Sequence, residues 1–213
     1  MFVAFATVYV VWGSTYLAIR VALETLPPFS MAALRMLTAG LVLLVWLRRR
    51  GAPAPTPIHC WHAAISGILL LTGGNGLVVW AEQTVPSGLA ALIVSLVPVW
   101  FALIAALLPR GAAPERRTLL GIAAGFGGML LLVTGSPSAN HASAYSIWGV
   151  LALLVAGISW AGGSLYSKHH AHAESPWMTA ALQMLFGGAA LLVPAAGTGD
   201  KTRRGETRTG GEK

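Results

Sequence analysis

Charged side chains are scarce in this sequence. Only 10% of its 213 residues are Asp, Glu, Lys or Arg, whereas a soluble globular domain carries about 25%. Charges this few cannot cover the surface of a soluble protein of this size, and 55% of the residues are hydrophobic. A soluble enzyme or binding domain is therefore excluded, and an integral membrane protein is predicted.

Cysteine and acidic residues are also scarce. Cys60 is the only cysteine, which excludes a disulfide within the chain and a cysteine metal cluster. Seven acidic residues face 14 Lys and Arg, for a net charge of +7, but the basic residues form short clusters between apolar runs rather than one basic face. This arrangement does not favour nucleic-acid binding.

Motifs of membrane enzymes are missing as well. The chain contains neither His-Glu-x-x-His nor Gly-x-Ser-x-Gly, and its apolar runs hold no pair of carboxylates for acid–base chemistry. His169, His170 and His172 near Glu174 could in principle hold a metal, but beside Lys168 they indicate a hydrated basic interface. We therefore predict no enzyme, cofactor or metal site.

The hydrophobic residues form seven long runs. A membrane-spanning helix needs about 20 apolar residues, and the runs lack the alternation of membrane strands. We predict an all-α membrane protein of about seven transmembrane helices. The predicted spans are residues 2–23, 29–47, 61–81, 88–108, 118–135, 147–166 and 177–196.

Basic residues alternate between the predicted loops. Loops 48–60 and 109–117 hold three arginines each, and loop 167–176 holds Lys168, whereas loops 24–28, 82–87 and 136–145 hold no Lys or Arg. Because Lys and Arg stay on the cytoplasmic side, the N-terminus and the even-numbered loops are predicted to lie in the cytoplasm. The protein is expected in the cytoplasmic membrane.

The last residues depart from this alternation. Residues 199–213 contain five Lys and Arg on the side predicted to be outside, and their composition is typical of disorder. Two interpretations remain open for the polar tail 197–213. It is an ordinary hydrophilic tail, or membrane sequence ends near Gly197 and foreign sequence follows, as after a frameshift.

The chain contains an internal repeat at an offset of 148 residues. Residues 11–47 align with residues 159–195 without a gap, with twelve identities in 37 positions. Trp12 falls on Trp160, and Gly40 falls on Gly188. Five spans separate the partners, so the two copies cross the membrane in opposite directions. Inverted repeats of this kind are typical of secondary transporters, with the substrate site between the halves.

Several segments carry a resemblance to a known family. They are residues 12–20 (Trp-Gly-Ser-Thr-Tyr-Leu-Ala-Ile-Arg), 27–28 (Pro-Pro), 32–35 (Ala-Ala-Leu-Arg), 81–91 (Ala-Glu-Gln-Thr-Val-Pro-Ser-Gly-Leu-Ala-Ala), 97–99 (Val-Pro-Val) and 121–125 (Gly-Ile-Ala-Ala-Gly). Together they resemble EamA-type transporters of the drug/metabolite transporter superfamily, and most closely its YedA-like exporters. The likeness covers about residues 9–196.

The resemblance implies ten helices in two EamA repeats. On that pattern, residues 1–135 are the first repeat and residues 146–196 are a partial second repeat, so the chain looks C-terminally truncated or frameshifted. The implied function is a multi-pass inner-membrane exporter of small metabolites, amino acids or drugs that works by alternating access. The alternative is an inactive fragment or half-molecule, and a homodimer or a partner chain supplying the missing helices stays open.

Polar residues inside the spans are candidates for substrate contact, because ionisable groups there are costly. Arg35 could bind a substrate carboxylate with its planar fork, or could pair with Glu82. Its repeat partner is the neutral Gln183. Asn75 could line a cavity or bond a neighbouring helix. The candidate cavity residues are Trp12, Ser14, Tyr16, Arg35, Asn75 and Trp160.

Four further residues are candidates for structural or gating roles. Glu82 is the alternative partner of Arg35. Pro98 interrupts the fourth predicted span and could act as a hinge. Gly121 and Gly125 form a small-residue surface for close packing inside the fold or between two copies.

Overall fold

Helices are the regular secondary structure of the part of the chain that the computed structural model describes, residues 6–7, 10, 27–108, 114–134, 146–170 and 175–197. This confirms the predicted all-α class. The helices are α2 (Pro28–Arg49), α3 (Pro57–Gly67), the π-helix η1 (Ile68–Gly76), α4 (Leu77–Ala81), α5 (Ser87–Val94), α6 (Val97–Leu107), α7 (Arg116–Thr134), α8 (Ile147–His169) and α9 (Pro176–Gly197).

Five helical stretches are long and apolar enough to cross a membrane, which confirms a multi-pass membrane protein. They are Pro28–Arg49, Pro57–Ala81, Ser87–Leu107, Ile147–His169 and Pro176–Gly197. Each coincides with a predicted span to within four residues. The predicted span 118–135 is α7, which is not among the five, and the predicted span 2–23 lies almost wholly outside the described residues.

Proline and basic residues mark the helix ends. Pro28, Pro57 and Pro176 each occupy the first position of a helix, where the amide that proline lacks has no helical partner. Arg48 and Arg49 lie in the last turn of α2, where their positive charges interact favourably with the negative end of the helix dipole. The chain then turns at Gly51, whose φ of 81° suits glycine.

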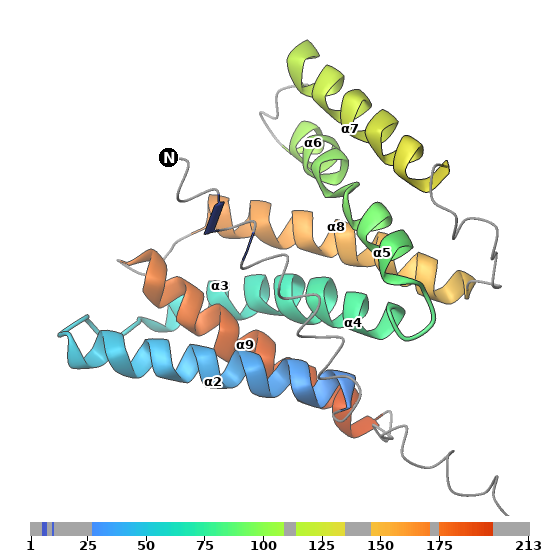
Figure 1. Cartoon of the computed structure of the whole chain (residues 1–213). Coiled ribbons are helices and arrows are strands. Elements are labelled where there is room, and N and C mark those ends of the chain that lie inside the picture. Colours follow the sequence, from blue (N-terminus) through green and yellow to red (C-terminus); the bar gives the residue numbers. More distant parts are fainter. Residues whose placement is uncertain are drawn as a thin grey trace, which may run out of the picture.

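The helix ends with basic residues gather at one end of the bundle. Leu47 near the end of α2, Ala63 near the start of α3 and Met178 at the start of α9 form one buried cluster. Lys168 lies at the end of α8, which meets the start of α3 through Tyr166. We call this the basic end. Figure 1 shows α2, α3 and α9 with one end each on the same side.

The opposite end of the bundle is closed by the turn between α4 and α5. Ala81, Val85 and Ala90 form a buried cluster there with Leu153 of α8. Gly149 of α8 gives the turn room, because a Cβ at Gly149 would lie 2.6 Å from the Val85 side chain. The turn therefore packs directly on α8 through Val85.

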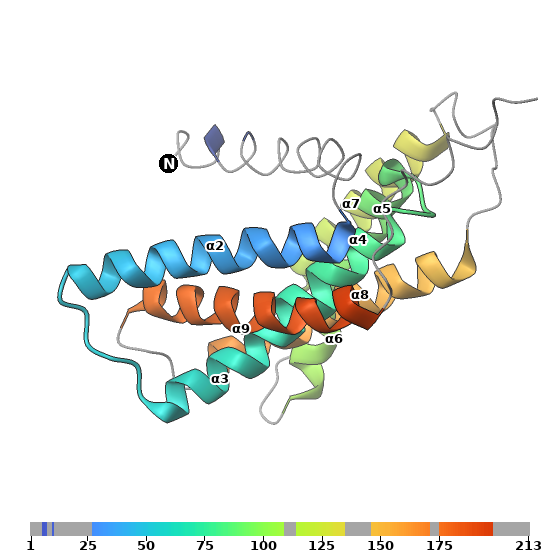
Figure 2. The same ribbon diagram turned by 90° about the horizontal axis from the view of Figure 1, so that it is seen from below.

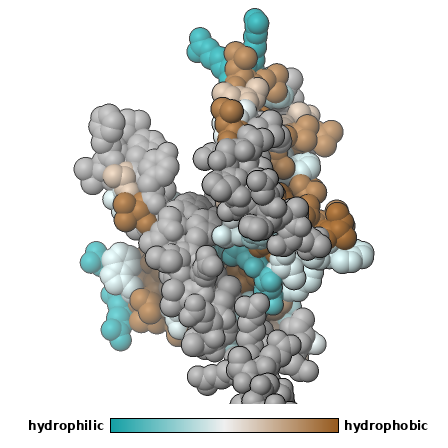
Figure 3. Space-filling model, turned by 45° about the vertical axis from the view of Figure 1, so that its right-hand side comes forward, coloured by the Kyte–Doolittle hydropathy of each residue, from teal (hydrophilic) through white to brown (hydrophobic). Residues whose placement is uncertain are grey.

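Apolar side chains face outward along the bundle. Leu107, Val193 and Leu131 are among the large hydrophobic residues with more than a third of their surface exposed, and Figure 3 shows apolar groups open on the surface. The buried core is built largely from small residues, as membrane helices that pack without a hydrophobic drive require. The exposed apolar surface fits contact with lipid.

Tryptophans stand at both ends of the bundle. Trp46, Trp61 and Trp177 at the basic end are 46%, 62% and 64% exposed, and Trp148 at the start of α8 is 69% exposed. Trp is enriched at the two membrane–water interfaces, where its ring is apolar and its N–H polar. Their positions place the hydrocarbon layer between these two levels.

Helices α2 and α9 run side by side in opposite directions along their length (Figures 1 and 2). Leu47 near the end of α2 meets Met178 at the start of α9, and Phe29 at the start of α2 meets Leu191 near the end of α9. These two helices are the copies that the 148-residue offset aligns. The repeat partners therefore form one antiparallel pair.

Two glycines, Gly40 on α2 and Gly188 on α9, allow the two helices to approach closely. The contacts that these glycines make are reciprocal. A Cβ at Gly40 would lie 2.9 Å from the Met184 Cβ and 3.1 Å from the Leu185 side chain. A Cβ at Gly188 would lie 3.1 Å from the Met36 Cβ and 3.0 Å from the Leu37 side chain. Since 36, 37 and 40 become 184, 185 and 188 at the offset of 148, each copy contacts the other through the same residues.

Candidate functional site

The candidate cavity residues divide into described and undescribed positions. Trp12, Ser14 and Tyr16 lie outside the described residues, so the structure gives them no place. Arg35 lies on α2, Asn75 on η1 and Trp160 on α8. All three are half-buried.

Arg35 holds a buried nitrogen that is not satisfied within the described part of the chain. Its Nε is buried and has no hydrogen-bond partner there. An unpaired buried nitrogen costs free energy that a ligand or an added neighbour would recover. Contact between Arg35 and a substrate carboxylate stays a prediction.

The alternative role of Arg35, an ion pair with Glu82, is not found. The described residues contain no ion pair between them, although both side chains are half-buried. Glu82 follows the last residue of α4, and its backbone N–H donates to the carbonyl of Val78. Burial raises the pKa of the Glu82 carboxyl above its ordinary value. Of the two roles left open for Arg35, the ion pair with Glu82 is therefore not observed among the described residues.

Trp160 of α8 contacts η1 at the residue that precedes Asn75. The ring of Trp160 lies against Gly74, where a Cβ would be 2.8 Å from its Cε3 atom. Asn75 is the next residue along the chain, and the structure gives its amide no hydrogen bond to another described residue. The described part of the chain likewise gives Arg35 no hydrogen bond to either residue.

The π-helix η1 is a feature that sequence reasoning missed. It replaces α-helical geometry over nine residues in the middle of a span. Ser159 of α8 donates to the carbonyl of Leu69 at 2.7 Å, and Thr72 donates to the carbonyl of Gly187 at 3.1 Å. π-helical segments occur often at functional sites. The run Gly73-Gly74-Asn75-Gly76 was the available sequence indication.

A second missed feature is a polar cluster near the basic end. Gln183 of α9 donates to the hydroxyls of Ser66 on α3 at 2.8 Å and Ser167 on α8 at 3.0 Å. Ser66 is only 1% exposed and donates to the carbonyl of His62 at 2.8 Å. The cluster ties three helices together by hydrogen bonds. The sequence identified Gln183 only as the repeat partner of Arg35.

Aromatic and imidazole rings extend this cluster toward the surface. Nδ1 of His62 lies 2.7 Å from the hydroxyl of Tyr166, and His170 stacks on Tyr166 with ring centroids 3.9 Å apart. His170 is exposed beside Lys168, in keeping with the predicted hydrated interface, and its ring contact with Tyr166 adds to that prediction. His172 and Glu174 lie outside the described residues, and no group of three or more metal-ligating side chains occurs among those described.

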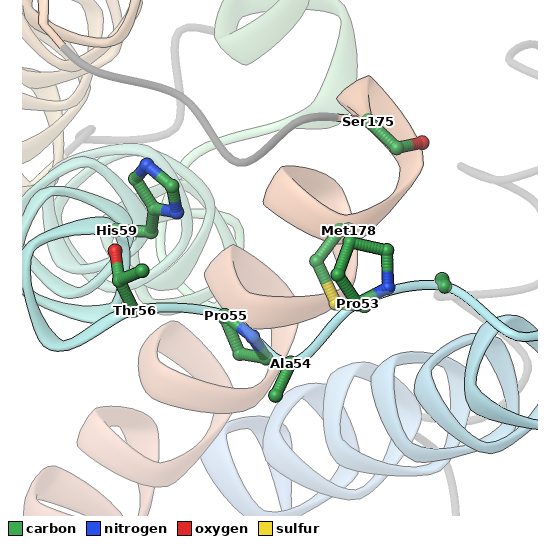
Figure 4. Close-up of a pocket in the computed structure, with 8 residues that line it drawn as sticks. Pro53, Ala54, Pro55, Thr56, His59, Ser175 and Met178 are labelled. Carbon is green, nitrogen blue, oxygen red and sulfur yellow. The ribbon is translucent and has the colours of Figure 1, made fainter.

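A small cavity of about 60 Å³ opens beside this end. Figure 4 shows Pro53, Pro55 and Thr56 of the loop between α2 and α3 near Met178 at the start of α9. A binding pocket for a drug-sized molecule measures about 300–1,000 Å³. This cavity can hold water but not a metabolite.

Pro98 lies where the fourth predicted span is broken. Helix α5 ends at Val94 and α6 begins at Val97, with Pro98 in its first turn. The hydroxyl of Ser95, the residue that follows α5, donates to the carbonyl of Leu92 in the last turn of α5 at 2.7 Å. The interruption is observed, and a hinge role stays a prediction.

Gly121 and Gly125 do not pack inside the described fold. A Cβ at either position would have no neighbour within 4 Å, and α7 lies at the outside of the bundle (Figure 1). Their predicted close packing within the fold is not met in the described residues. Contact with a second copy stays a prediction.

Comparisons with known proteins give one family. The profile described as "EamA-like transporter family" matches residues 1–134 and 147–209. The chain is 37% identical over 202 residues to the "Uncharacterized inner membrane transporter YedA" of Escherichia coli K12, covering 94% of this chain and 63% of that protein. No solved structure matches.

Two further relatives are more distant. The "WAT1-related protein At3g02690, chloroplastic" of Arabidopsis thaliana is 29% identical over 187 residues, covering 85% of this chain and 44% of the relative. The "Probable amino-acid metabolite efflux pump" of Escherichia coli K12 is 26% identical over 171 residues, covering 76% and 51%. The chain thus spans less than two thirds of the length of these relatives.

Proposed function

The chain belongs to the EamA-like transporter family. We propose that it is a membrane transporter that exports small metabolites of the amino-acid class by alternating access. The name of one relative, an amino-acid metabolite efflux pump, supports the substrate class. The carrying observation is the reciprocal contact of α2 and α9 through Gly40 and Gly188.

Reciprocal packing supports alternating access in a specific way. Two inverted copies related by a two-fold axis in the membrane plane can exchange their inward and outward arrangements by rocking about the contact that they share. The α2–α9 pair is such a contact, because Gly40 and Gly188 meet equivalent residues. The axis would pass between these two glycines.

Arg35 gives the proposed site its charge preference. Gln183 holds the equivalent position in the second copy, and its amide donates hydrogen bonds to the hydroxyls of Ser66 and Ser167. Nε of Arg35, in contrast, is buried and has no hydrogen-bond partner among the described residues. A guanidinium binds a carboxylate with two parallel hydrogen bonds. The site would therefore be asymmetric, with the anionic group of the substrate on the side of α2.

Direction follows from the distribution of basic residues. Arg48, Arg49 and Lys168 lie at the basic end, which the positive-inside rule assigns to the cytoplasm. The substrate would enter from this end. The N-terminus would then lie in the cytoplasm, and the start of α8 would face outward.

Everted membrane vesicles test this proposal. Their interior corresponds to the cell exterior, so an exporter accumulates labelled amino acids inside them. The chain is expressed alone and together with the part of the Escherichia coli relative that it does not match. Accumulation above that of empty vesicles is expected in at least one case. If it requires the added part, the chain is a half-molecule, and if neither case transports, the exporter proposal fails.

A further inference from the structure

We infer that His62, Tyr166 and His170 form a pH-sensitive latch that holds the start of α3 to the end of α8 at the basic end of the bundle. The hydroxyl of Tyr166 joins the ring of His62, and the ring of His170 lies on that of Tyr166. We call these three residues the latch. Its meaning for transport rests on the proposed function, but its existence does not.

The latch brings two imidazoles close together. The ring centroids of His62 and His170 are 5.0 Å apart, and the His62 and Tyr166 centroids are 5.7 Å apart. Nδ1 of His170 lies 2.9 Å from the carbonyl oxygen of Tyr166, which fixes the ring over the last turn of α8. His170 is exposed and His62 is half-buried, so protons reach both from the basic end.

One proton leaves this arrangement intact, and a second does not. An imidazolium at His170 is compatible with stacking on an aromatic ring. Nδ1 of a neutral His62 accepts a hydrogen bond from Tyr166, and that of a charged His62 donates to the same oxygen. With both rings charged, two positive groups would lie 5.0 Å apart and repel. Imidazoles ordinarily gain their charge between about pH 8 and pH 5.

No carboxylate on the described residues of the helices around the latch would compensate a second proton. On α3 and α8 the neighbouring titratable groups are His59, Cys60, Lys168 and His169. At the end of α2, a guanidinium nitrogen of Arg48 donates to the carbonyl of Ala52, and Arg50 and Arg49 follow. Neither α2, α3, α8 nor α9 carries a carboxylate in its described residues, and α9 carries no titratable side chain.

A neutral anchor lies deeper in the same contact. Gln183 holds Ser66 and Ser167 by hydrogen bonds that do not titrate. Gly67 packs on the backbone of Gln183, where a Cβ would lie 2.5 Å from its carbonyl oxygen. Repulsion in the latch would therefore move the end of α8 beyond Ser167 and the turns of α3 before Ser66, while the anchored residues stay in place. Acid on the cytoplasmic side would loosen this entrance without separating the bundle.

Cys60 reports on the latch. It is the only cysteine of the chain, lies two residues before His62 and is half-buried against the cluster of Leu47 and Met178. Its alkylation rate by a maleimide is measured in vesicles between about pH 8 and pH 5. The rate for the parent is divided by the rate for His170→Gln at the same pH. This ratio removes the effect of pH on the ionisation of the Cys60 thiol, which both proteins share. The ratio is expected to rise about fourfold or more as the pH falls, the factor for two unit charges 5.0 Å apart in water.

His169→Gln is the matched control, because His169 is exposed and adjacent but outside the ring contacts. It should keep the full response to pH. If His170→Gln does not fold, His62→Gln serves in its place, because it also leaves one imidazole. A ratio that stays flat, or a response lost equally in His169→Gln, overturns the latch. Labelling needs no transport, so a rising ratio supports the latch even if the chain transports nothing with or without the added part of the relative, an outcome that rejects only the exporter proposal.

Discussion

Gly40 and Gly188, 148 residues apart in the chain, each lie against the repeat equivalent of the other's neighbours. Gly40 meets Met184 and Leu185, and Gly188 meets Met36 and Leu37. A chance contact between two helices has no reason to be reciprocal in this way. The internal repeat found in the sequence is therefore also present in the packing of α2 on α9.

Gly40→Ala is expected to destabilise the protein. Its new Cβ would lie 2.9 Å from the Met184 Cβ and 3.0 Å from the carbonyl oxygen of Ala181. Overpacking of this kind costs about 1–3 kcal/mol. Gly162→Ala on α8 is the control, because no described atom lies within 4 Å of its Cβ position. That change should stabilise the helix by about 0.5–1 kcal/mol. Thermal unfolding in detergent measures both, and equal effects would reject the close contact.

Gly73→Ala should disturb the contact between η1 and α8. A Cβ at Gly73 would collide with Oγ of Ser159, which donates to the carbonyl of Leu69. Ser159→Ala removes that oxygen, so Gly73→Ala should cost less in the Ser159→Ala background. A double-mutant cycle on the free energy of unfolding gives the coupling, about 0.5–3 kcal/mol for residues in contact. Additive effects would contradict the contact.

Glu82→Gln should stabilise the protein at neutral pH. Burial raises the pKa of the Glu82 carboxyl above 4.5, so folding favours its protonated form, and the stability this gives is lost as the pH rises through the raised value. Gln is neutral at every pH. The melting temperature of Glu82→Gln should exceed that of the parent near about pH 7 and match it near about pH 4.

Glu115→Gln is the control for this measurement, because Glu115 is exposed at the start of α7. It should leave the melting temperature unchanged at both values of pH. If Glu82→Gln instead has a lower melting temperature than the parent near neutral pH, the result would indicate that Glu82 forms an ion pair with Arg35.

Arg35→Gln should reduce transport of carboxylate substrates in everted vesicles. The substitution gives the first copy the same residue, glutamine, that the second copy has at the equivalent position 183. Losing a charge-assisted hydrogen bond of about 1.5–3 kcal/mol lowers the rate by about tenfold or more. Arg49→Gln, an exposed position at the basic end, should leave transport unchanged. Equal transport by the parent and Arg35→Gln, at equal expression, would remove Arg35 from the site.

The spans and the equivalence of α2 and α9 in the repeat could be predicted from the sequence because both depend on simple features, whereas the direct packing of these two helices was not predicted. Length and hydropathy fix the spans, and Gly40 and Gly188 are identical residues at a single offset. Proline at position 98 likewise indicated the break that the structure places between α5 and α6.

The polar contacts could not be predicted, because they depend on which helix faces meet. His62 and Tyr166 are 104 residues apart and share no motif, yet they are joined at 2.7 Å. The π-helix depends on contacts of its glycines with Ser159 and Trp160 rather than on propensity. Arg35 and Glu82 were expected to pair because both are charged and predicted on one side of the membrane, but the described structure does not join them.

The central claim is that the two copies cross the membrane in opposite directions, and sidedness of single cysteines tests it most directly. In a Cys60→Ser background, Arg50→Cys at the end of α2, Trp177→Cys at the start of α9 and Trp148→Cys at the start of α8 are all exposed positions. A membrane-impermeant maleimide is applied to intact cells and to everted vesicles. Positions 50 and 177 should react only in everted vesicles, and position 148 only in intact cells. Reaction of positions 50 and 177 from opposite sides would contradict the inverted pair.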